Sequence, residues 1–533
     1  MTSILQILVL LLVVIAAVAV LAKRLQIPPA ILLVITGVVL ALVPGLPTVH
    51  LAPNFVLLFV LPPIVYSSSV AMSWREFRFS LRPISLLAVG CVLFTTIVTA
   101  AVTHALLGFS WSAGFVLGAI VSPPDPVAPL SIARRLQLPK RLLVILEGEG
   151  LANDASALIL YRFAVAAVGA STFSLSQAAG TFAAILCAEI LWGIGVGWLM
   201  LRLRRWVQDP RIEVMLSILT PFLAYWPPQH LGGSGVLATV TAGLYISWNG
   251  LRLISAATRL QGIFFWDFLM YLTEGFVFLI TGLQVRTLIS GIHGNSLHDL
   301  TVSAAIVCGV VILARFVWMF PATYLPRWLI PSIARNDPAP PWQWPFALAF
   351  TGVRGIVSLA AALAIPLTTE SGVMFPDRDR ILFLTFSVIL VTLVGQGLML
   401  PSVIRALGLA NAGRRERHAD SLEEADARRQ AIEAAARRLD QLTLEHQLPE
   451  AITAPLRSHL RDRRLYAERR ADAAEVRRLV DRQDEIELLL IAAERQQIND
   501  LYRLGKIQDE ARRRIERELD LRDAQLTNAK TEP

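Results

Sequence analysis

Long apolar runs dominate the first 410 residues of the chain, and short polar segments separate them. A helix needs about 20 mostly apolar residues to cross the hydrocarbon core of a bilayer, and most of these runs approach or exceed that length. The pattern predicts an all-α polytopic membrane protein with thirteen transmembrane helices. The predicted spans are 4–22, 28–43, 54–72, 83–107, 113–134, 141–168, 177–202, 211–227, 233–248, 263–285, 301–323, 345–367 and 382–404.

The pattern becomes strongly charged after residue 410. Residues 411–533 carry 51 charged side chains, whereas residues 1–410 carry only 39. Alanine, arginine, glutamate and leucine recur at helical spacing over 414–446, 456–502 and 507–528. We therefore predict a transmembrane domain at 1–410 and a water-soluble, helical regulatory tail at 411–533.

The loops between the predicted spans differ in charge. One set of alternate loops carries seventeen basic residues, and the other set carries three. Cytoplasmic loops of membrane proteins are enriched in Lys and Arg, so the N-terminus is expected outside, the tail in the cytoplasm, and the protein in the cell membrane. The rich set is Lys23, Arg24, Arg75, Arg78, Arg82, Arg134, Arg135, Lys140, Arg141, Arg202, Arg204, Arg205, Arg211, Arg252, Arg259, Arg327 and Arg335, and the poor set is Arg286, Arg378 and Arg380.

Composition narrows the classes of function. A hydrophobic content of 55% and a mean hydropathy of +0.56 exclude an ordinary soluble enzyme. The net charge of +8 arises in the loops of the membrane domain, so it does not indicate nucleic-acid binding. Cys91, Cys187 and Cys308 lie in apolar runs, and we expect neither a disulfide nor a metal site from them.

Ten ionisable side chains inside the predicted spans are candidates for a functional or structural role. Asp125, Asp154 and Arg354 lie near the middle of their spans. Charges at that depth are costly, face the bundle interior or water, and mark substrate and ion pathways. The other seven are Glu147, Glu149, Arg162, Glu189, Asp267, Glu274 and Arg315.

Two of the spans with central charges are poor helix formers. Prolines surround Asp125, and glycines flank Arg354 on both sides. Proline removes a backbone donor and breaks a helix, and irregular backbone at membrane depth is tolerated only inside protein or beside a water cavity. One interrupted span in each half of the chain is typical of secondary transporters built from inverted repeats. We therefore predict two broken helices, with spans four to six repeated as spans eleven to thirteen.

The sixth span places its acidic residues on different faces. Glu147 and Asp154 are seven residues apart and share a face, whereas Glu149 points about 140° away from Asp154. Glu149 is therefore predicted to form a structural salt bridge with Arg354. Asp154 then faces a cavity near Asp125, with Glu147 toward the cytoplasmic mouth.

This arrangement indicates a transport chemistry. A carboxylate at the bilayer centre beside water can carry a proton or hold a small hard cation, but not both. Na⁺ and Li⁺ take oxygen ligands, which Asp154, Asp125 and backbone carbonyls freed by the prolines would supply. Competition between H⁺ and Na⁺ for one site, with alternating access, predicts a cation/proton antiporter. The transported ions are the only ligands expected, without a cofactor.

Two other classes of membrane protein are less consistent with the sequence. A cation channel would need a selectivity-filter loop, which the sequence lacks. An intramembrane aspartyl protease also needs two aspartates, but its usual Gly-x-Gly-Asp setting is absent and it would not require Arg354. Dependence of ion flux on an opposing proton gradient would separate an antiporter from a channel.

Several segments resemble the sodium/proton exchanger branch of the monovalent cation:proton antiporters, its NhaP-like bacterial members in particular. The resemblance covers about residues 1–410, and the segments occur together and in order. They are FVLPPIVYSSSVAM at 59–72, SPPDPVAP at 122–129, EGEGLANDASALILY at 147–161, FVFLITGLQV at 276–285 and TGVRGIVSLAAALAIP at 351–366.

The resemblance implies a thirteen-span homodimer in the lipid bilayer, with a mobile core bundle and a dimerisation bundle, and a role in pH homeostasis. It also implies that Asp154 of the pair Asn153–Asp154 binds the ion and that Asp125 is the aspartate of the unwound helix. Glu149 and Arg354 match the family's structural pair. Members with Asn–Asp are usually electroneutral, so we expect electroneutral exchange.

Two positions depart from the family pattern. Members often have Thr before the first aspartate and Ser after the glutamate, where this chain has Pro124 and Gly150. We therefore expect weaker Na⁺ binding or poorer discrimination against K⁺, with a K⁺-preferring antiporter as the alternative. We also expect Gly150→Ser to restore one ligand without disturbing the broken helix. Further candidate ligands or cavity residues are Ser122, Ser358, Glu147, Asp267 and Glu274.

Overall fold

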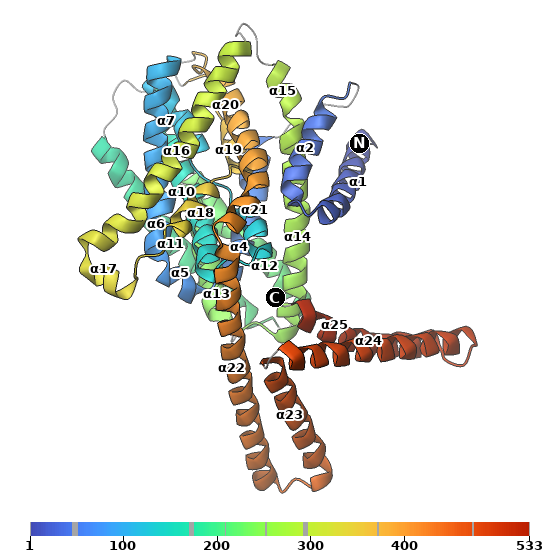
Figure 1. Cartoon of the computed structure of the whole chain (residues 1–533). Coiled ribbons are helices and arrows are strands. Elements are labelled where there is room, and N and C mark those ends of the chain that lie inside the picture. The colour runs from blue at the N-terminus through green and yellow to red at the C-terminus, as the bar shows by residue number, and fades with distance from the viewer. Residues whose placement is uncertain are drawn as a thin grey trace. The chain divides into compact units, whose positions relative to one another are not determined.

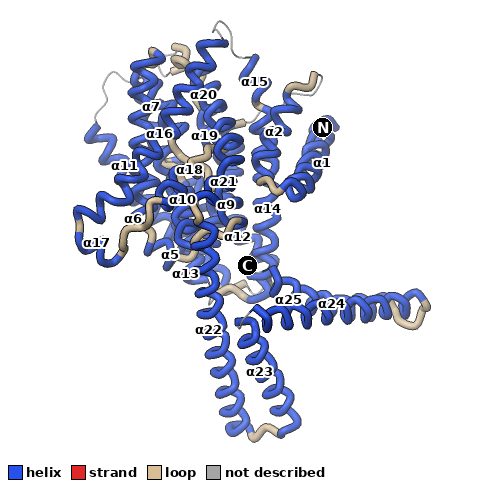
Figure 2. The backbone as a smooth tube through the Cα atoms, in the orientation of Figure 1, coloured by secondary structure: helices blue, strands red, loops and turns tan. Residues whose placement is uncertain are grey.

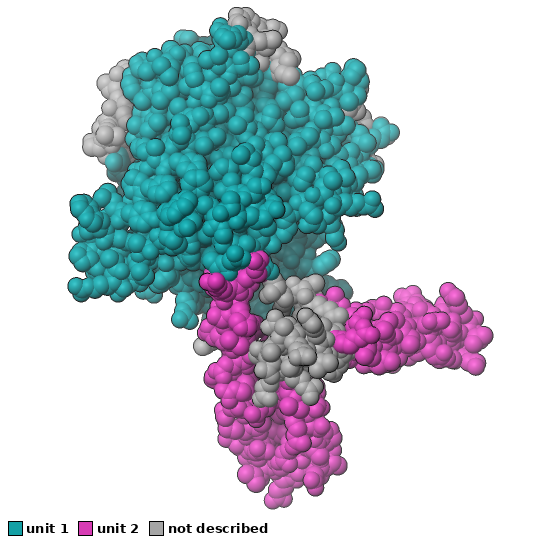
Figure 3. Space-filling view, viewed as in Figure 1, with its two compact units in different colours: residues 1–413 teal, residues 414–533 magenta. Residues whose placement is uncertain are grey.

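The computed structural model describes residues 2–44, 52–169, 175–207, 209–250, 253–290, 297–369, 373–471 and 474–531. Helices form nearly all of this described chain (Figure 2), in which the only strand-like feature is an isolated bridge between Thr368 and Met374. The chain divides into two compact units, residues 1–413 and 414–533 (Figure 3). The all-helical class predicted from the sequence is confirmed.

The first unit is a bundle of helices (Figure 1). Its helices are α1 (Thr2–Leu25), α2 (Pro29–Ala41), α3 (Pro53–Phe55), α4 (Leu61–Ala71), α5 (Trp74–Phe79), α6 (Leu81–Ser85), α7 (Val92–Leu107), α8 (Trp111–Val121), α9 (Val127–Arg135), α10 (Lys140–Gly169), α11 (Leu175–Arg204), α12 (Pro210–His230), α13 (Val236–Gly250), α14 (Ala256–Leu283), α15 (Val285–Ser290), α16 (Leu297–Leu329), α17 (Pro331–Asn336), α18 (Gln343–Phe350), α19 (Ile356–Leu363), α20 (Arg378–Leu390) and α21 (Gly397–Ala406). Three π-helical stretches continue neighbouring helices, namely η1 (Val56–Val60), η2 (Leu86–Cys91) and η3 (Val391–Gln396).

Eight helical segments of the described chain are long and apolar enough to cross a membrane. They are Gln6–Leu25, Pro53–Ala71, Leu81–Leu107, Lys140–Val168, Ala179–Arg204, Ala256–Leu288, His298–Leu329 and Arg378–Ala406, and α2 and α8 are shorter apolar helices. Length and composition alone identify these segments, so the number of thirteen spans stays a prediction.

The two predicted broken helices are present. Residues 122–126 separate α8 from α9, and residues 351–355 separate α18 from α19. Pro123 and Pro124 have no backbone N–H to donate to the preceding turn, and α8 ends at Val121 just before them. The second break lies in the Gly-rich segment around Arg354, where the backbone has little propensity to continue a helix.

The second unit consists of long polar helices. They are the greater part of α22 (Leu409–His446), then α23 (Glu450–Ala471), α24 (Ala474–Arg503) and α25 (Asp509–Thr531). Arg457 contacts Asp440 at 2.9 Å and joins α23 to α22. The range 456–502, predicted as one helix, contains parts of two, and residues 472–473 between them lie outside the described residues.

Two glycines allow α2 and α14 to cross closely. A Cβ atom on Gly282 of α14 would lie 2.2 Å from the Val34 carbonyl oxygen and 2.8 Å from the Gly37 Cα atom. Small residues at helix crossings in membranes let the backbones approach and pack. The close α2–α14 contact therefore requires residues without a side chain at Gly37 and Gly282.

We predict that Gly282→Ala lowers the melting temperature of the purified protein, because the extra methyl group must push α2 away. Overpacking of this kind costs about 1–3 kcal/mol. Gly262→Ala is the matched control on the same helix, since nothing lies within 4 Å of a Cβ atom there. Equal melting temperatures for the two variants would show that the crossing is not tight.

Candidate cation site

The two helix breaks meet backbone to backbone inside the first unit. The amide of Asp125 donates a 2.6 Å hydrogen bond to the carbonyl of Val353. Both residues lie in non-helical backbone, one from each half of the membrane unit. The crossing therefore brings together two segments that are more than 200 residues apart in sequence.

Arg354 satisfies backbone carbonyls at the crossing. Its Nε donates to the carbonyl of Val121 at 2.9 Å, and its Nη1 donates to the carbonyl of Gly352. Its own amide donates to the Thr392 hydroxyl at 3.0 Å. Val121 is the last residue of α8, whose final carbonyls have no partner within the helix. Arg354 therefore caps one broken helix from the break of the other.

Glu149 forms its ion pair with Arg315 of α16. The two contacts are 2.5 Å to Oε1 and 2.8 Å to Oε2, and both side chains are buried. Arg315 also donates to the carbonyl of Leu348, in the last turn of α18, at 3.1 and 3.0 Å. The prediction that Glu149 pairs with Arg354 is therefore wrong. Helical spacing predicts the face of α10 on which Glu149 lies. The arrangement of the neighbouring helices determines which arginine it contacts.

Two glycines are required by this packing. A Cβ atom on Gly352 would lie 2.5 Å from Cδ of Arg315 and 2.9 Å from Nη1 of Arg354. A Cβ atom on Gly355 would lie 1.6 Å from Oδ2 of Asp125. The glycines of the second break thus make room for both guanidinium groups and for one carboxyl group.

Asp125 and Asp154 both line a cavity of about 450 Å³ beside the crossing. Asp125 also accepts a 2.9 Å hydrogen bond from the amide of Val127, the first residue of α9. A carboxylate that caps a helix N-terminus in this way is stabilised by the unpaired amides there. Glu147 lines the cavity from the same helix as Asp154, whereas Glu149 points to the other side of α10.

Asn153 ties α10 to the first break. Its Nδ2 atom donates to the carbonyl of Pro124 at 2.7 Å, and the residue is fully buried. Asn153 does not line the cavity, whereas Pro124 does. The amide therefore positions the next residue, Asp154, beside the broken segment.

The cavity has an acidic lining. The opposite wall is α14, and at one end Arg134 contacts Glu147 at 2.9 Å. Charges of one sign that line a cleft raise the local concentration of the opposite ion, so this cavity favours cations. Within the described residues, its charged side chains are Arg134 and the five carboxyl groups of Asp125, Glu147, Asp154, Asp267 and Glu274.

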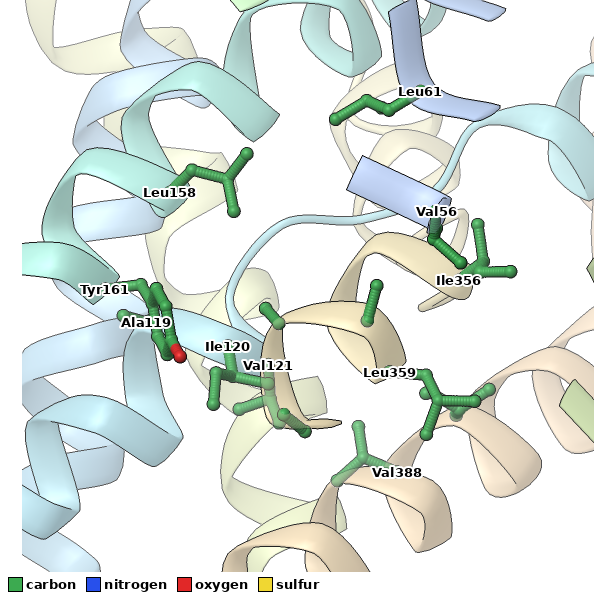
Figure 4. Close-up of a cluster of buried hydrophobic side chains, with 14 of the residues drawn as sticks. Val56, Leu61, Ala119, Ile120, Val121, Leu158, Tyr161, Ile356, Leu359 and Val388 are labelled. Carbon is green, nitrogen blue, oxygen red and sulfur yellow. The ribbon is translucent and has the colours of Figure 1, made fainter. Parts of the chain in front are cut away.

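Part of the cavity lining belongs to a buried hydrophobic cluster. Val56, Leu61 and Ile356 line the cavity and belong to a buried hydrophobic cluster (Figure 4). From α10, Leu158 and Tyr161 join the same cluster one and two turns beyond Asp154. This side of α10 is therefore packed against buried, mostly apolar side chains.

The candidate hydroxyl ligands differ in position. Ser122 is buried and donates to the carbonyl of Ala119 at 3.1 Å, whereas Ser358 lines the cavity. Gly150 also lines the cavity, but a Cβ atom there would lie 2.3 Å from Cγ of Pro126. The expectation that Gly150→Ser leaves the broken helix undisturbed is therefore wrong, because the proline ring occupies that space.

Side chains donate to several backbone carbonyls around the first break. Three carbonyls in or before the first break accept hydrogen bonds from protein side chains. They are those of Ala119, Val121 and Pro124, which accept from Ser122, Arg354 and Asn153, respectively. These donors fix the three carbonyls in place.

Sequence reasoning missed Arg315, although it marked the residue as a charge inside a span. It also left Glu189 without a firm partner, and the structure shows that this buried carboxylate accepts from the amides of Ser234, Gly235 and Leu237. These amides open α13, whose N-terminus carries no internal partner for them. Glu189 is therefore a helix cap.

We predict that Glu149→Gln and Arg315→Gln each lower the melting temperature strongly, since each leaves a buried charge uncompensated. Such a loss costs about 3–5 kcal/mol. The double variant should recover part of it, as a double-mutant cycle on purified protein would measure. The cycle of Glu149→Gln with Arg354→Gln is the control and should show weaker coupling. Stronger coupling to Arg354 would contradict the Arg315 pairing.

Comparison with known proteins identifies the family. The model of the sodium/hydrogen exchanger transmembrane family matches residues 8–406. A Na⁺/H⁺ exchanger of Mycobacterium tuberculosis is 35% identical over 515 residues, which are 95% of this chain and 93% of that protein. A sodium, potassium, lithium and rubidium/H⁺ antiporter of Bacillus subtilis is 35% identical over 393 residues, 70% of this chain and 57% of that protein.

A solved structure shares the fold. The sodium proton antiporter MjNhaP1 of Methanocaldococcus jannaschii aligns with a TM-score of 0.62 and 18% identity, over 76% of this chain and 98% of that one. The family model and the relatives cover the broken helices and the carboxyl-lined cavity together. This chain therefore belongs to the sodium/hydrogen exchanger family of multi-pass membrane transporters.

Proposed function

We propose that the chain exchanges Na⁺ for H⁺ by binding the two ions in turn at Asp154, with Asp125 as the second carboxyl ligand. The observation that carries this proposal is the cavity that both carboxyl groups line at the crossing of the broken helices. A protonated carboxyl group has no charge with which to attract a cation, so one group cannot hold both ions. This competition couples the two flows.

Alternating access follows from the two ends of the cavity. We propose that the described conformation faces the cytoplasm, since Arg134 and Glu147 lie at the open end, next to loops rich in basic residues. The apolar cluster around Leu158 and Tyr161 closes the route on the other side. Transport then requires the helices that carry Asp154 to move against their neighbours until this cluster separates.

The cation range is proposed to include Na⁺, Li⁺ and K⁺. The Bacillus subtilis relative is named for sodium, potassium, lithium and rubidium. In this chain Pro124 and Gly150 offer no hydroxyl group, and we propose that Asp125, Asp154 and Ser358 of the cavity lining supply the side-chain oxygen ligands. Fewer fixed ligands select less strictly by ion size, so a K⁺-preferring exchange is the second candidate.

We propose a homodimer in the cell membrane, with the N-terminus outside and residues 414–533 as a cytoplasmic regulatory unit. The bias of basic residues between alternate loops supports the orientation. The family resemblance supports the dimer, and the long polar helices of the second unit support a location in water.

The first prediction of the mechanism is that Asp154→Asn abolishes exchange. The amide keeps the shape but can neither carry the proton nor supply a charge to the cation. Proton movement in proteoliposomes after addition of Na⁺, Li⁺ or K⁺ measures the effect, with wild-type melting behaviour as the check on folding. Asp379→Asn, at an exposed position on α20, is the matched control and should exchange normally. Substantial cation-driven proton flux from Asp154→Asn would contradict the proposal.

The second prediction is that exchange is electroneutral. Asn153 cannot ionise, and if Asp125 keeps its charge through the cycle, one H⁺ replaces one Na⁺ at Asp154. An imposed membrane potential should therefore leave the proton flux of proteoliposomes unchanged at fixed Na⁺ and H⁺ gradients. A potential that drives or reverses the flux would show that more than one proton moves for each cation.

A further inference from the structure

Three arginines converge on one carboxylate away from the cavity. Asp337, which follows α17, accepts hydrogen bonds from Arg82 of α6, from Arg141 of α10 at 2.7 Å and from Arg327 of α16 at 2.8 Å. Arg327 also donates from Nε to the Asp337 carbonyl at 3.0 Å. We call these four residues the Asp337 cluster.

The Asp337 cluster lies where three apolar spans end on the same side. Arg82 and Arg141 begin the spans Leu81–Leu107 and Lys140–Val168, and Arg327 lies near the end of His298–Leu329. Helices α5, α6 and α17 appear at the same end of the first unit (Figure 1). This is the depth at which lipid headgroups meet a membrane protein.

The cluster carries an excess of positive charge. Burial alone would raise the pKa of Asp337, but the hydrogen bonds and charges of Arg141 and Arg327 outweigh it and lower the pKa below its ordinary value. The carboxylate is therefore ionised at neutral pH. One negative charge faces three guanidinium groups, which leaves a net charge of about two positive units.

The arginines also have guanidinium N–H donors that Asp337 does not use. Arg82 and Arg141 each contact Asp337 through one Nη2 atom, although a guanidinium group has five N–H donors. Nε of Arg141 is buried and has no hydrogen-bond partner in the described part of the chain. A buried donor of this kind costs free energy unless a ligand or water satisfies it.

A narrow cleft of about 40 Å³ opens between these arginines. Its lining includes Arg82, Arg141 and Arg327, with Leu86, Met319 and Trp344 below them. The cleft is too small for an acyl chain and large enough for one or two oxygen atoms of an anion. The ring of Phe79 lies 5.3 Å from the Arg141 guanidinium and is itself largely exposed.

We propose that the Asp337 cluster binds the phosphate of an anionic ligand, for which a phospholipid headgroup at this membrane surface is the source in the cell. Arginine forks match phosphate oxygens in geometry and charge, and basic pockets between transmembrane helices on the cytoplasmic side bind anionic headgroups. The acyl chains would lie outside the cleft, along the lipid-facing surface. This binding is distinct from ion exchange and does not depend on Asp154.

The test uses the full-length protein in detergent, with its melting temperature followed as lipid is added. Phosphatidylglycerol should raise the melting temperature, whereas phosphatidylcholine, whose headgroup has no net charge, should raise it far less. Inorganic phosphate is the third arm, and an equal rise with phosphate alone would assign the site to a free anion. No rise with phosphatidylglycerol or with phosphate would overturn the proposal.

Arg141→Lys separates ligand binding from the internal ion pair. Lysine can still contact Asp337 as a point charge, but it loses the remaining donors of the fork. The half-effective phosphatidylglycerol concentration should rise about tenfold, the factor that corresponds to one lost charge-assisted hydrogen bond. Arg405→Lys, at an exposed position on α21, is the matched control and should not change it. An unchanged lipid response in Arg141→Lys would contradict the proposal.

Asp337→Asn distinguishes a ligand-binding site from an ion-pair cluster that only stabilises the fold. Loss of the carboxylate should lower the melting temperature without lipid, because three arginines then repel one another. It should also enlarge the rise caused by phosphatidylglycerol, since the lipid phosphate replaces the lost negative charge. If the cluster only stabilises the fold and binds no ligand, Asp337→Asn should lower the melting temperature without enlarging the rise caused by phosphatidylglycerol. That result would overturn the proposal.

Discussion

The membrane unit depends on one constraint, which is that broken backbone within a bilayer must find its hydrogen-bond partners inside the protein. Lipid offers no hydrogen-bond partners, and each unsatisfied amide or carbonyl is costly. The two breaks cross each other, and the Asp125 amide donates a hydrogen bond to the Val353 carbonyl. The carbonyls left at the ends of α8 and α18 receive guanidinium donors from Arg354 and Arg315. The ion pair with Glu149 follows, because Arg315 brings a charge that must be balanced.

The same solution places four charges at favourable helix ends. Carbonyl ends of helices attract cations and amide ends attract anions. Arg354 lies at the end of α8, and Arg315 lies at the end of α18. Asp125 lies at the beginning of α9 and Glu189 at the beginning of α13. Asp154 does not share this pattern, because it lies within α10 and faces the cavity. This position is consistent with the role in ion exchange that we propose for Asp154.

Sequence reasoning identified the fold class, both breaks and the residues around them, because prolines, glycines and charges in apolar runs are local signals. It failed where the answer depends on how helices are placed against each other. Glu149 had two buried arginines available in other spans, and spacing within its own helix could not choose Arg315 over Arg354. Gly150 appeared to be a missing ligand, whereas the ring of Pro126 requires the glycine. The Asp337 cluster joins three segments that are distant in sequence, around Arg82, Arg141 and Arg327–Asp337, so no local pattern indicated it.

Asn153 shows how structure and ion coupling depend on one side chain. Its amide must donate to the Pro124 carbonyl to hold α10 against the first break. An ionised aspartate cannot donate a hydrogen bond, and a protonated one can do so only while it keeps its proton. An aspartate at this position would therefore tie the integrity of the crossing to a titration step and add a second exchangeable proton beside Asp154. Asparagine supplies the donor permanently, so the crossing stays intact whatever the state of Asp154. In the proposed mechanism, the carboxyl groups of the cavity then set the number of protons that the site can exchange.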